Sequence, residues 1–339
     1  MPDEGALDAA MARAVTLAER GPEHGPNPRV GCVILAPDGT TLGEGWHRGA
    51  GTPHAEVAAI ADAHAAARDL RGATAVVTLE PCSHTGRTGP CVDALTQAGV
   101  AAVQFAVQDP GDASSGGAAV LRQRGIAAEL RQDARAAAVT RRWVTSMRLG
   151  RPYVIAKWAA TLDGRMAAAD GTSVWITGAQ AREHAHGVRA RVDAIAVGTG
   201  TVKADDPQLS ARPRGEEAAH QPLRVVVGES DTAGARVWRD ANAVALRTRS
   251  PHEVLAALHA REVRTLVVEG GPAVLSAFVR EGLVDEVHAY IAPALLGDGP
   301  SVVEHLGIAT MADALRGQDV NFQPLGADIL VTALFSRGS

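Results

Sequence analysis

The chain has 339 residues, 46% of them hydrophobic and 21% charged, a composition typical of a globular protein long enough for two domains. The aromatic share of 3% and the net charge of −5 argue against a nucleic-acid platform or an anionic membrane as partner. Residues 1–19 lack the apolar core of a signal peptide, and no run approaches the roughly 18 apolar residues of a membrane span. We therefore expect a cytoplasmic protein.

The first half of the chain alternates helix-like and strand-like segments. Helices are predicted over residues 9–20, 53–68, 90–98, 117–124 and 133–149. Strands are predicted over residues 30–35, 41–46, 75–79, 101–107 and 126–130, the first two forming a hairpin around Pro37-Asp-Gly-Thr40. This order predicts an α/β fold in which helices cover a sheet.

A second alternating series follows the Gly150-Arg-Pro152 sequence, where Gly and Pro mark a break between domains. We therefore predict one domain over residues 1–148 and another over 149–339. The second domain is expected to contain a helix over 179–190 and an exposed loop over 212–221. Its strands are predicted over residues 153–159, 194–197, 223–227, 265–269, 286–292 and 329–334.

Three cysteines occur, a count too small and odd for a disulfide framework. Cys32 lies in an apolar run and is predicted to be a buried, small hydrophobic residue. Cys82 follows Pro81 after a predicted strand, and Cys91 opens a predicted helix. We expect both of these cysteines to lie at helix N-termini, where the helix dipole stabilises a thiolate.

His54-Ala-Glu56 at the start of a predicted helix completes a pattern typical of zinc deaminases. One imidazole and two thiolates, from His54, Cys82 and Cys91, would leave a fourth tetrahedral position for water. Glu56 is then expected to carry the proton between water and the leaving amine. Either motif alone is common by chance, but the two in this order predict a catalytic zinc site.

The zinc-deaminase pattern has two residues between its cysteines, whereas eight separate Cys82 from Cys91 here. The segment Cys82-Ser-His-Thr-Gly-Arg-Thr-Gly-Pro-Cys91 resembles the deaminase domain of the bifunctional riboflavin-biosynthesis deaminase-reductases. Gly25-Pro-Asn-Pro-Arg-Val-Gly31 and Gly43-Glu-Gly-Trp-His47 resemble the same domain. The resemblance implies a cytidine-deaminase-like fold acting on a diaminopyrimidinone that carries ribose 5-phosphate.

The same resemblance implies substrate contacts in the first domain. It places Asn27 against the pyrimidine and makes His47 a second substrate contact, although a surface or structural role for His47 stays open. His84, Arg87 and Thr88 are further candidates for contacts to the base or the phosphate.

The second half resembles the reductase domain of the same family. The resemblance is carried by Lys157-Trp-Ala-Ala-Thr-Leu-Asp-Gly-Arg165, Ser173-Val-Trp-Ile-Thr-Gly178, Arg189 to Gly198, Thr201 to Leu209 and Glu269-Gly-Gly-Pro272. It implies a dihydrofolate-reductase-like fold that uses NADPH to reduce a ribosyl sugar to a ribityl chain. By this match, the substrate contacts are Ser173, Arg189, Leu209, Arg212 and Glu269. The expected cofactor contacts are Ala159, Met166, Trp175, Thr201, Asp205, Gly271, Pro272 and Ala273.

Apart from the resemblance, the residues of this half indicate a cofactor site less specifically than those of the first half indicate a zinc site. Neither half carries a Gly-x-Gly-x-x-Gly fingerprint after its first strand. Glu269-Gly-Gly-Pro272 follows an apolar strand and precedes a helical pattern, so its backbone could hold a cofactor phosphate or form an ordinary loop. Lys157 and Asp205 are our candidates for assisting hydride transfer, and a lone strand lysine is as often a surface charge.

The combined interpretation is a bifunctional riboflavin-pathway enzyme with one Zn²⁺ per deaminase site and NADPH as reductant. We expect a small phosphorylated pyrimidine as substrate, no nucleic-acid or membrane partner, and a homo-oligomer. One alternative is a nucleoside or RNA zinc deaminase with an unrelated second domain. Another is a binding or regulatory protein that kept the pockets without turnover, although pure binding would not require Glu56.

Overall fold

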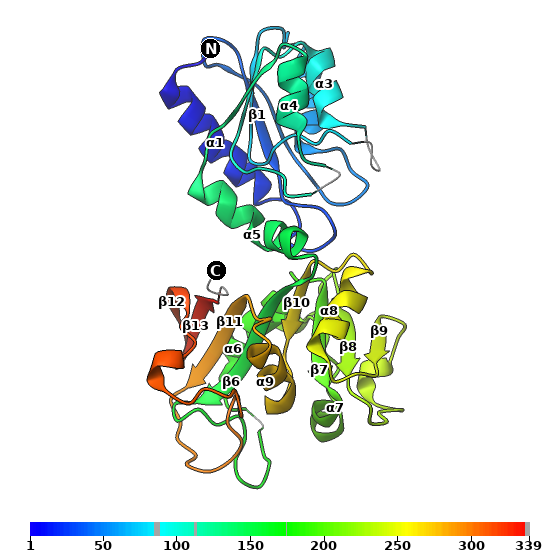
Figure 1. Cartoon of the computed structure of the whole chain (residues 1–339), viewed down its shortest axis with the longest axis vertical. Coiled ribbons are helices and arrows are strands. Elements are labelled where there is room, and N and C mark those ends of the chain that lie inside the picture. Colours follow the sequence, from blue (N-terminus) through cyan, green and yellow to red (C-terminus); the bar gives the residue numbers. More distant parts are fainter. Residues whose placement is uncertain (85–88, 112–113, 174, 336–339) are drawn as a thin grey trace. The chain divides into compact units, whose positions relative to one another are not determined.

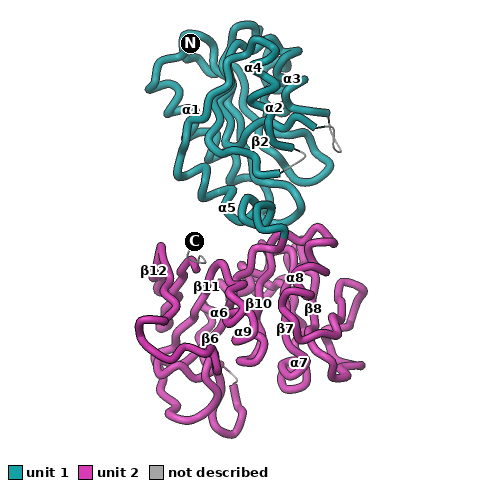
Figure 2. Tube along the Cα trace, in the orientation of Figure 1, with its two compact units in different colours: residues 1–150 teal, residues 151–339 magenta. Residues whose placement is uncertain are grey.

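The computed structural model describes residues 1–84, 89–111, 114–173 and 175–335. The chain forms two compact units, Met1–Gly150 and Arg151–Ser339 (Figure 2). Each unit is built around its own β-sheet with helices packed on it (Figure 1). No helix within the described ranges has the length and apolar character needed to cross a membrane.

The first unit contains a five-stranded sheet in the order β2-β1-β3-β4-β5. β1 pairs antiparallel with β2 and β3, whereas β3, β4 and β5 run parallel. The elements in chain order are α1 (Glu4–Ala18), β1 (Gly31–Leu35), β2 (Thr41–Trp46), α2 (Ala55–Ala65), β3 (Thr74–Val77), α3 (Cys91–Ala98), β4 (Ala102–Phe105), α4 (Gly117–Gln123), β5 (Ala127–Leu130) and α5 (Ala134–Leu149).

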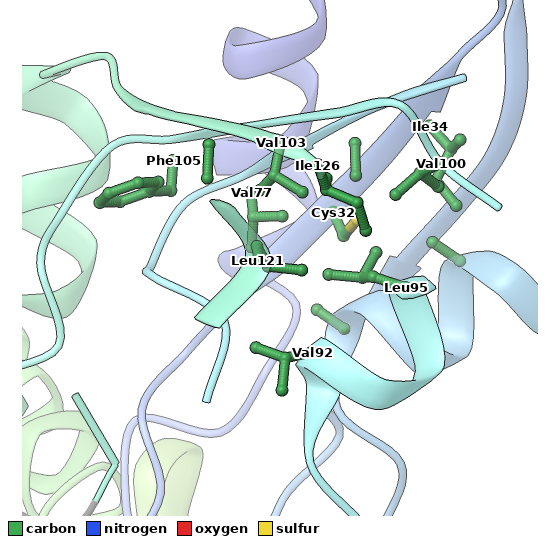
Figure 3. Close-up of a cluster of buried hydrophobic side chains, with 14 of the residues drawn as sticks. Cys32, Ile34, Val77, Val92, Leu95, Val100, Val103, Phe105, Leu121 and Ile126 are labelled. Carbon is green, nitrogen blue, oxygen red and sulfur yellow. The ribbon is translucent and has the colours of Figure 1, made fainter. Parts of the chain in front are cut away.

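Alternate residues of the interior strand β1 build two cores on opposite faces of the sheet, as the two-residue period of a strand requires. Cys32 and Ile34 pack with side chains of α2, α3 and α4 in the core shown in Figure 3. Val33 and Leu35 pack on the other face with α1 and α5. Cys32 is fully buried, which confirms its prediction as a small hydrophobic core residue.

Two glycines of β2 let α2 approach the sheet closely. A Cβ added at Gly43 would lie 2.3 Å from the Ala59 carbonyl oxygen, and one at Gly45 would lie 2.3 Å from the Ala59 nitrogen. Any larger residue would therefore push α2 outward, because neither backbone can yield without disturbing its element. This contact fixes the position of α2, whose first turn carries Glu56 and begins next to His54.

The second unit contains an eight-stranded sheet in the order β12-β13-β11-β6-β10-β7-β8-β9. Strands β11, β6, β10, β7, β8 and β9 run parallel, and β13 and β12 extend the sheet antiparallel. The elements in chain order are β6 (Tyr153–Thr161), α6 (Ala179–Arg189), β7 (Ala194–Gly198), α7 (Thr199–Asp205), η1 (Pro213–Gly215), β8 (Leu223–Val227), η2 (Arg236–Trp238), β9 (Ala243–Leu246), α8 (Pro251–His259), β10 (Thr265–Val268), α9 (Pro272–Arg280), β11 (Glu286–Ala292), η3 (Met311–Asp313), β12 (Gln318–Leu325) and β13 (Asp328–Leu334).

The parallel strands of this sheet carry mainly apolar residues on both faces, as buried parallel strands usually do. Val154 and Ala156 of β6 pack with side chains of α8 and α9. Tyr153 and Ile155 of the same strand pack on the opposite face with Val188 of α6. Because β6, β10, β7, β8 and β9 run parallel, their carboxyl ends lie at one edge of the sheet. Side chains packed on both faces fix the positions of these strands.

Candidate active sites

Three side chains of the first unit converge as a candidate metal centre. The Nδ1 atom of His54 lies 3.2 Å from Sγ of Cys91 and 3.6 Å from Sγ of Cys82. All three ligand atoms lie within 4.8 Å of one another. Zinc bonds of about 2.0 Å to nitrogen and about 2.3 Å to sulfur in a tetrahedron place such ligands about 3.5 Å apart. The donor set and its spacing therefore fit a single zinc ion.

The two thiols are electrostatically unequal. Hydrogen bonding to Cys91 lowers the pKa of the Cys82 thiol to about 4, although burial opposes this effect. Hydrogen bonding to Cys82, together with burial, raises the pKa of Cys91 well above its ordinary value. The pair by itself thus favours a single thiolate, and a divalent cation would allow both cysteines to ionise.

The backbone around the cysteines differs from the prediction in one respect. Cys91 is the first residue of α3, as expected, but Cys82 lies in the segment after β3 and does not begin a helix. The prediction that both cysteines occupy helix N-termini is therefore wrong for Cys82. Its sulfur instead accepts a 3.4 Å hydrogen bond from the backbone N–H of Cys91, so the start of α3 stabilises both sulfurs.

Glu56 lies in the first turn of α2, two residues after His54, and is only 3% exposed. Burial raises its pKa, against the opposing effect of the nearby His54. A carboxyl group whose pKa is moved toward neutrality is suited to accept and release a proton. Glu56 is not part of the three-residue ligand cluster, which leaves its carboxyl group available for that task.

Asn27 and His47 lie beside the metal cluster. The His47 ring packs edge-on against the His54 ring with centroids 5.4 Å apart, and His47 is 4% exposed. Its Nδ1 lies 3.1 Å from the Pro53 carbonyl oxygen, and its Nε2 lies 2.9 Å from Nδ2 of Asn27. Because a carbonyl can only accept, Nδ1 donates and Nε2 accepts from the Asn27 amide. His47 thereby fixes the orientation of the Asn27 side chain.

Three further candidates for substrate contacts in the first unit are His84, Arg87 and Thr88. Nδ1 of His84 is buried and has no hydrogen-bond partner among the residues that the structure describes. Arg87 and Thr88 lie outside the described residues.

Sequence reasoning missed Glu80, a buried carboxylate two residues before Cys82 that binds backbone N–H groups. Glu80 is 8% exposed and directly precedes Pro81-Cys82. Its Oε1 accepts a 3.0 Å hydrogen bond from the backbone N–H of Ala118, and its Oε2 accepts a 3.3 Å bond from that of Asp109. The signal in the sequence is a charged residue that directly follows an apolar strand, which predicts burial only if a partner is known.

In the second unit, Lys157 and Arg189 converge on Glu269. Arg189 donates to both oxygens of Glu269, from Nε at 2.8 Å and from a terminal nitrogen at 2.7 Å, and Nζ of Lys157 donates at 3.2 Å. The Glu269 side chain is 8% exposed. Burial alone would raise its pKa, but the charges of Arg189 and Lys157 outweigh burial and hold the pKa well below its usual range. Glu269 is therefore a carboxylate shared by two cations.

Sequence reasoning also missed Tyr290 and His184, which flank this cluster. Nζ of Lys157 lies 5.5 Å from the centroid of the Tyr290 ring, and Nδ1 of His184 lies 2.8 Å from the Tyr290 hydroxyl. Tyr290 is 1% exposed. It lies on β11 and His184 on α6, so only the tertiary structure brings them to Lys157.

The segment that carries Leu209 and Arg212 lies against α6. The carbonyl oxygen of Ser210 is 3.3 Å from a terminal nitrogen of Arg189, and the backbone N–H of Arg212 donates to Nδ1 of His186 at 3.1 Å. Leu209 is 4% exposed and has a left-handed φ of 54°. These contacts bring Leu209 and Arg212 toward the Lys157-Arg189-Glu269 cluster.

The expected cofactor residues are only partly linked to one another. The backbone N–H of Gly271, directly before Pro272 and Ala273 at the start of α9, donates to Oγ1 of Thr201 at 3.1 Å. Ala159 lies on β6 opposite Tyr290 of β11, and Met166 is partly buried and packs against the core of the sheet.

For other expected residues, no hydrogen bond to Thr201 or Gly271 is found among the described residues. Trp175 is 69% exposed and lies 4.0 Å from the Arg182 guanidinium, and Ser173 precedes it in the same loop. Asp205, the last residue of α7, is exposed and has no hydrogen bond to Lys157 or Glu269 among the described residues.

Comparisons with known protein families define the class of protein to which this chain belongs. The family model for the cytidine and deoxycytidylate deaminase zinc-binding region matches residues 6–107, and the model for the RibD C-terminal domain matches residues 152–331. The chain therefore joins a zinc-binding, cytidine-deaminase-like domain to a reductase domain, which confirms the predicted α/β fold class and enzymatic nature. The alternative of a zinc deaminase with an unrelated second domain is disfavoured, because the second match covers nearly the whole second unit.

Relatives similar over nearly their full length define the family. The riboflavin biosynthesis protein RibD of Mycobacterium tuberculosis strain H37Rv is 43% identical over 96% of this chain and 96% of its own, and that of Escherichia coli K12 is 38% identical over 94% and 96%. The structure of Acinetobacter baumannii RibD, at 34% identity, gives a TM-score of 0.89 and covers 99% and 100% of the two chains. The chain belongs to the RibD family and is a bifunctional deaminase and reductase of riboflavin biosynthesis.

Proposed function

We propose that the first domain, residues 1–148, hydrolyses the 2-amino group of 2,5-diamino-6-(5-phosphoribosylamino)pyrimidin-4(3H)-one. We further propose that the second domain, residues 149–339, reduces the ribosyl chain of 5-amino-6-(5-phosphoribosylamino)uracil to ribityl with NADPH. A Thermotoga maritima structure described as a deaminase and reductase of these two compounds supports the proposal, with 31% identity, a TM-score of 0.86, and coverage of 98% of this chain and 99% of its own. The observation that carries it is the His/Cys/Cys cluster beside buried Glu56, in one chain with the reductase domain.

In the deaminase site, His54, Cys82 and Cys91 would hold the zinc ion, consistent with the match to a zinc-binding region. Zinc bound there would lower the pKa of a water molecule toward neutrality. Glu56 would take a proton from the attacking water and deliver it to the departing amino group, so that water and the amine become a carbonyl and ammonia. Asn27, oriented by His47, would present its amide oxygen to a ring N–H of the pyrimidine.

In the reductase site, NADPH would supply the hydride to the open-chain form of the sugar. Lys157 is held as a cation between Glu269 and the Tyr290 ring, and would donate a proton to the sugar as the ring opens or the hydride arrives. Asp205 would assist from the end of α7. The proposed substrate contacts are Ser173, Arg189, Leu209, Arg212 and Glu269. The proposed cofactor contacts are Ala159, Met166, Trp175, Thr201, Asp205, Gly271, Pro272 and Ala273.

The ion pair between Arg189 and Glu269 determines which N–H groups of Arg189 remain for a phosphate. Its Nε and one terminal nitrogen are engaged by Glu269, and the other terminal nitrogen lies 3.3 Å from the Ser210 carbonyl oxygen. Five N–H groups are available on a guanidinium, so Arg189 can keep Glu269 and still donate to a phosphate. Arg212, which is partly exposed, would complete the phosphate contact.

The zinc ligands are tested by metal content. Cys91→Ser is expected to reduce bound zinc to well below one ion per chain and to abolish ammonia release, because a neutral hydroxyl is a poor zinc ligand. NADPH oxidation with the aminouracil substrate should persist. Zinc is measured by elemental analysis of the purified protein.

Cys32→Ala is the matched control, since Cys32 is buried in the core and takes no part in the ligand cluster. This variant should keep wild-type zinc content. Full zinc occupancy in Cys91→Ser would contradict the ligand assignment.

The setting of the enzyme is also proposed. The substrate we propose is a small phosphorylated pyrimidine. A net charge of −5 supports the proposal that the chain has no nucleic-acid or membrane partner. We propose that the chain acts in the cytoplasm as a homo-oligomer.

A further inference from the structure

The loop that carries Asn27 connects α1 to β1. Residues 19–30 form neither helix nor strand, so the hydrogen bonds of a regular element do not hold Asn27 in place. Asn27 is partly exposed, and its side-chain nitrogen donates to Nε2 of the buried His47 at 2.9 Å. The backbone of Asn27 needs a separate anchor, because one hydrogen bond at the end of a side chain does not fix the loop behind it.

Asn27 is flanked by Pro26 and Pro28, which stiffen its backbone. Each proline ring fixes its own φ, and a proline restricts the residue before it to extended conformations. Neither proline has a backbone N–H, so neither can donate a hydrogen bond that would hold the loop against its surroundings. A stiff segment of this kind turns as one body, so a contact to the carbonyl of Pro26 can set the direction of Asn27.

Trp143 of α5 makes that contact. Its indole Nε1 donates a 2.8 Å hydrogen bond to the carbonyl oxygen of Pro26. This carbonyl belongs to the peptide group that contains the backbone nitrogen of Asn27, and a peptide group is planar. The hydrogen bond therefore fixes the plane from which Cα of Asn27 extends. Trp143 holds the backbone of Asn27, and His47 holds its side chain.

The helix that carries Trp143 is itself firmly held. α5 is the last helix of the first unit, and its N-cap residue Asp133 accepts hydrogen bonds from backbone N–H groups of the first turn (Figure 1). Ala136, Thr140 and Val144, spaced four residues apart, share one face of the helix and are buried. Trp143, three residues after Thr140, packs against the core that α2, α3 and α4 share. The indole N–H thus has a fixed position.

α5 has a second contact to the same loop, and this contact is weaker. A terminal nitrogen of Arg142 lies 3.7 Å from one carboxylate oxygen of Glu23, and a terminal nitrogen of Arg29 lies 4.0 Å from the other. The side chains of Arg142 and Glu23 are 29% and 32% exposed. An ion pair this long and this exposed contributes little. The short, partly buried hydrogen bond from Trp143 is therefore the stronger contact between α5 and the loop.

We propose that Trp143 is a positioning residue of the deaminase site, which fixes the backbone of Asn27 through the Pro26 carbonyl and thereby sets the affinity for the pyrimidine. The proposal rests on the pyrimidine contact proposed for Asn27 above. Asn27 binds the ring and takes no part in the proton transfer, so its contact is the same in the bound substrate and in the transition state. A contact of that kind changes KM and leaves kcat unaltered.

Trp143→Phe in the full-length protein tests this role, because phenylalanine keeps an aromatic ring in the core and removes the N–H donor. We expect KM of the diaminopyrimidinone in ammonia release to rise roughly 3- to 10-fold, as for the loss of one hydrogen bond. The value of kcat should change by less than about twofold. Zinc content and NADPH oxidation with the aminouracil should stay at wild-type values. A fall in kcat at unchanged KM would overturn the proposal.

Arg142→Gln is the matched control, because it removes the other contact from the same helix to the same loop. It should leave KM and kcat of ammonia release at wild-type values. An equal rise of KM in Arg142→Gln would show that the loop responds to the loss of any contact with α5, and would overturn the specific role of Trp143.

A double-mutant cycle tests whether Trp143 acts through Asn27. Asn27→Ala should raise KM by itself, and adding Trp143→Phe to it should have no further effect. Additive effects of the two substitutions on KM would overturn the proposal, because Trp143 would then influence the substrate by another route.

The same variants separate this inference from the proposed function. Wild-type protein that releases no ammonia from the diaminopyrimidinone would refute the deaminase proposal, and an Asn27→Ala variant with wild-type KM would refute the proposed contact of Asn27. A raised KM in Asn27→Ala beside a wild-type KM in Trp143→Phe would refute only the inference about Trp143.

Discussion

Glu56→Gln is expected to lower the rate of ammonia release from the diaminopyrimidinone by about 100- to 10,000-fold, the usual contribution of a general acid–base group. Glutamine preserves the size of this buried side chain but cannot accept and return a proton. Zinc content should stay at the wild-type level, since Glu56 is not part of the ligand cluster. NADPH oxidation with the aminouracil should also persist, because that chemistry takes place in the second unit.

The control for this variant is Glu44→Gln, which removes a carboxylate of β2 that pairs with Arg13 at the partly exposed surface of the same unit. Ammonia release by this control should match the wild-type rate. A Glu56→Gln enzyme that releases ammonia at the wild-type rate would show that another group carries the proton.

Glu269→Ala is expected to destabilise the second unit by about 3–5 kcal/mol, because Lys157 and Arg189 would lose their shared buried counter-charge. Reductase activity should be lost at the same time, since Lys157 would no longer be held in place. The free energy of unfolding is measured by chemical denaturation with a probe of the second unit. Ammonia release from the first unit should be retained.

The same carboxylate predicts a pH dependence of stability. The pKa of Glu269 is lowered on folding from an ordinary value of 4.5, so its ionised form stabilises the fold above that pH. This contribution is lost as pH falls below 4.5 toward the folded-state pKa. The stability difference between the wild type and Glu269→Gln should therefore shrink in acid.

Glu183→Gln, an exposed position on α6, is the control and should unfold as the wild type does at every pH. If Glu269→Ala unfolded with the wild-type free energy, the two cations would not depend on Glu269, and its structural role would be excluded.

The elements that carry the candidate metal centre can be predicted from the sequence, because the ligand residues lie next to residues that mark where a helix or strand begins or ends. Pro90 before Cys91 predicts a helix start, and α3 begins at Cys91. The expectation that Cys82 lies at a helix N-terminus is wrong, because the chain after β3 continues irregularly there. The hydrogen bond from the Cys91 N–H to the Cys82 sulfur depends on the folded loop, and no local pattern predicts it.

The reductase cluster shows what local patterns miss. Lys157 and Glu269 are 112 residues apart, and Arg189 and Glu269 are 80 apart, so their contact depends on the strand order of the sheet. The resemblance indicates Arg189 and Glu269 as substrate contacts, and Lys157 is our own candidate for assisting hydride transfer. Neither prediction indicates that Arg189 and Lys157 share one carboxylate. Nothing in the sequence marked Tyr290 or His184, because a tyrosine in an apolar strand and a histidine in a helix are ordinary core and surface residues.

Two edge strands of the second sheet, β9 and β12, are not predicted from the sequence, for a simple reason. β9 is a short edge strand of only partly buried residues, and β12 is an exposed edge strand that contains Pro324. Neither presents the regular apolar alternation from which strands are predicted.

By the proposed function, one chain deaminates the pyrimidine and then reduces its sugar. The most direct measurement follows ammonia release and NADPH oxidation together in purified protein supplied with the diaminopyrimidinone as the only substrate. We expect one ammonia released and one NADPH oxidised per substrate molecule, with ammonia appearing first. NADPH oxidation without ammonia, or ammonia release with no subsequent NADPH oxidation, would contradict it.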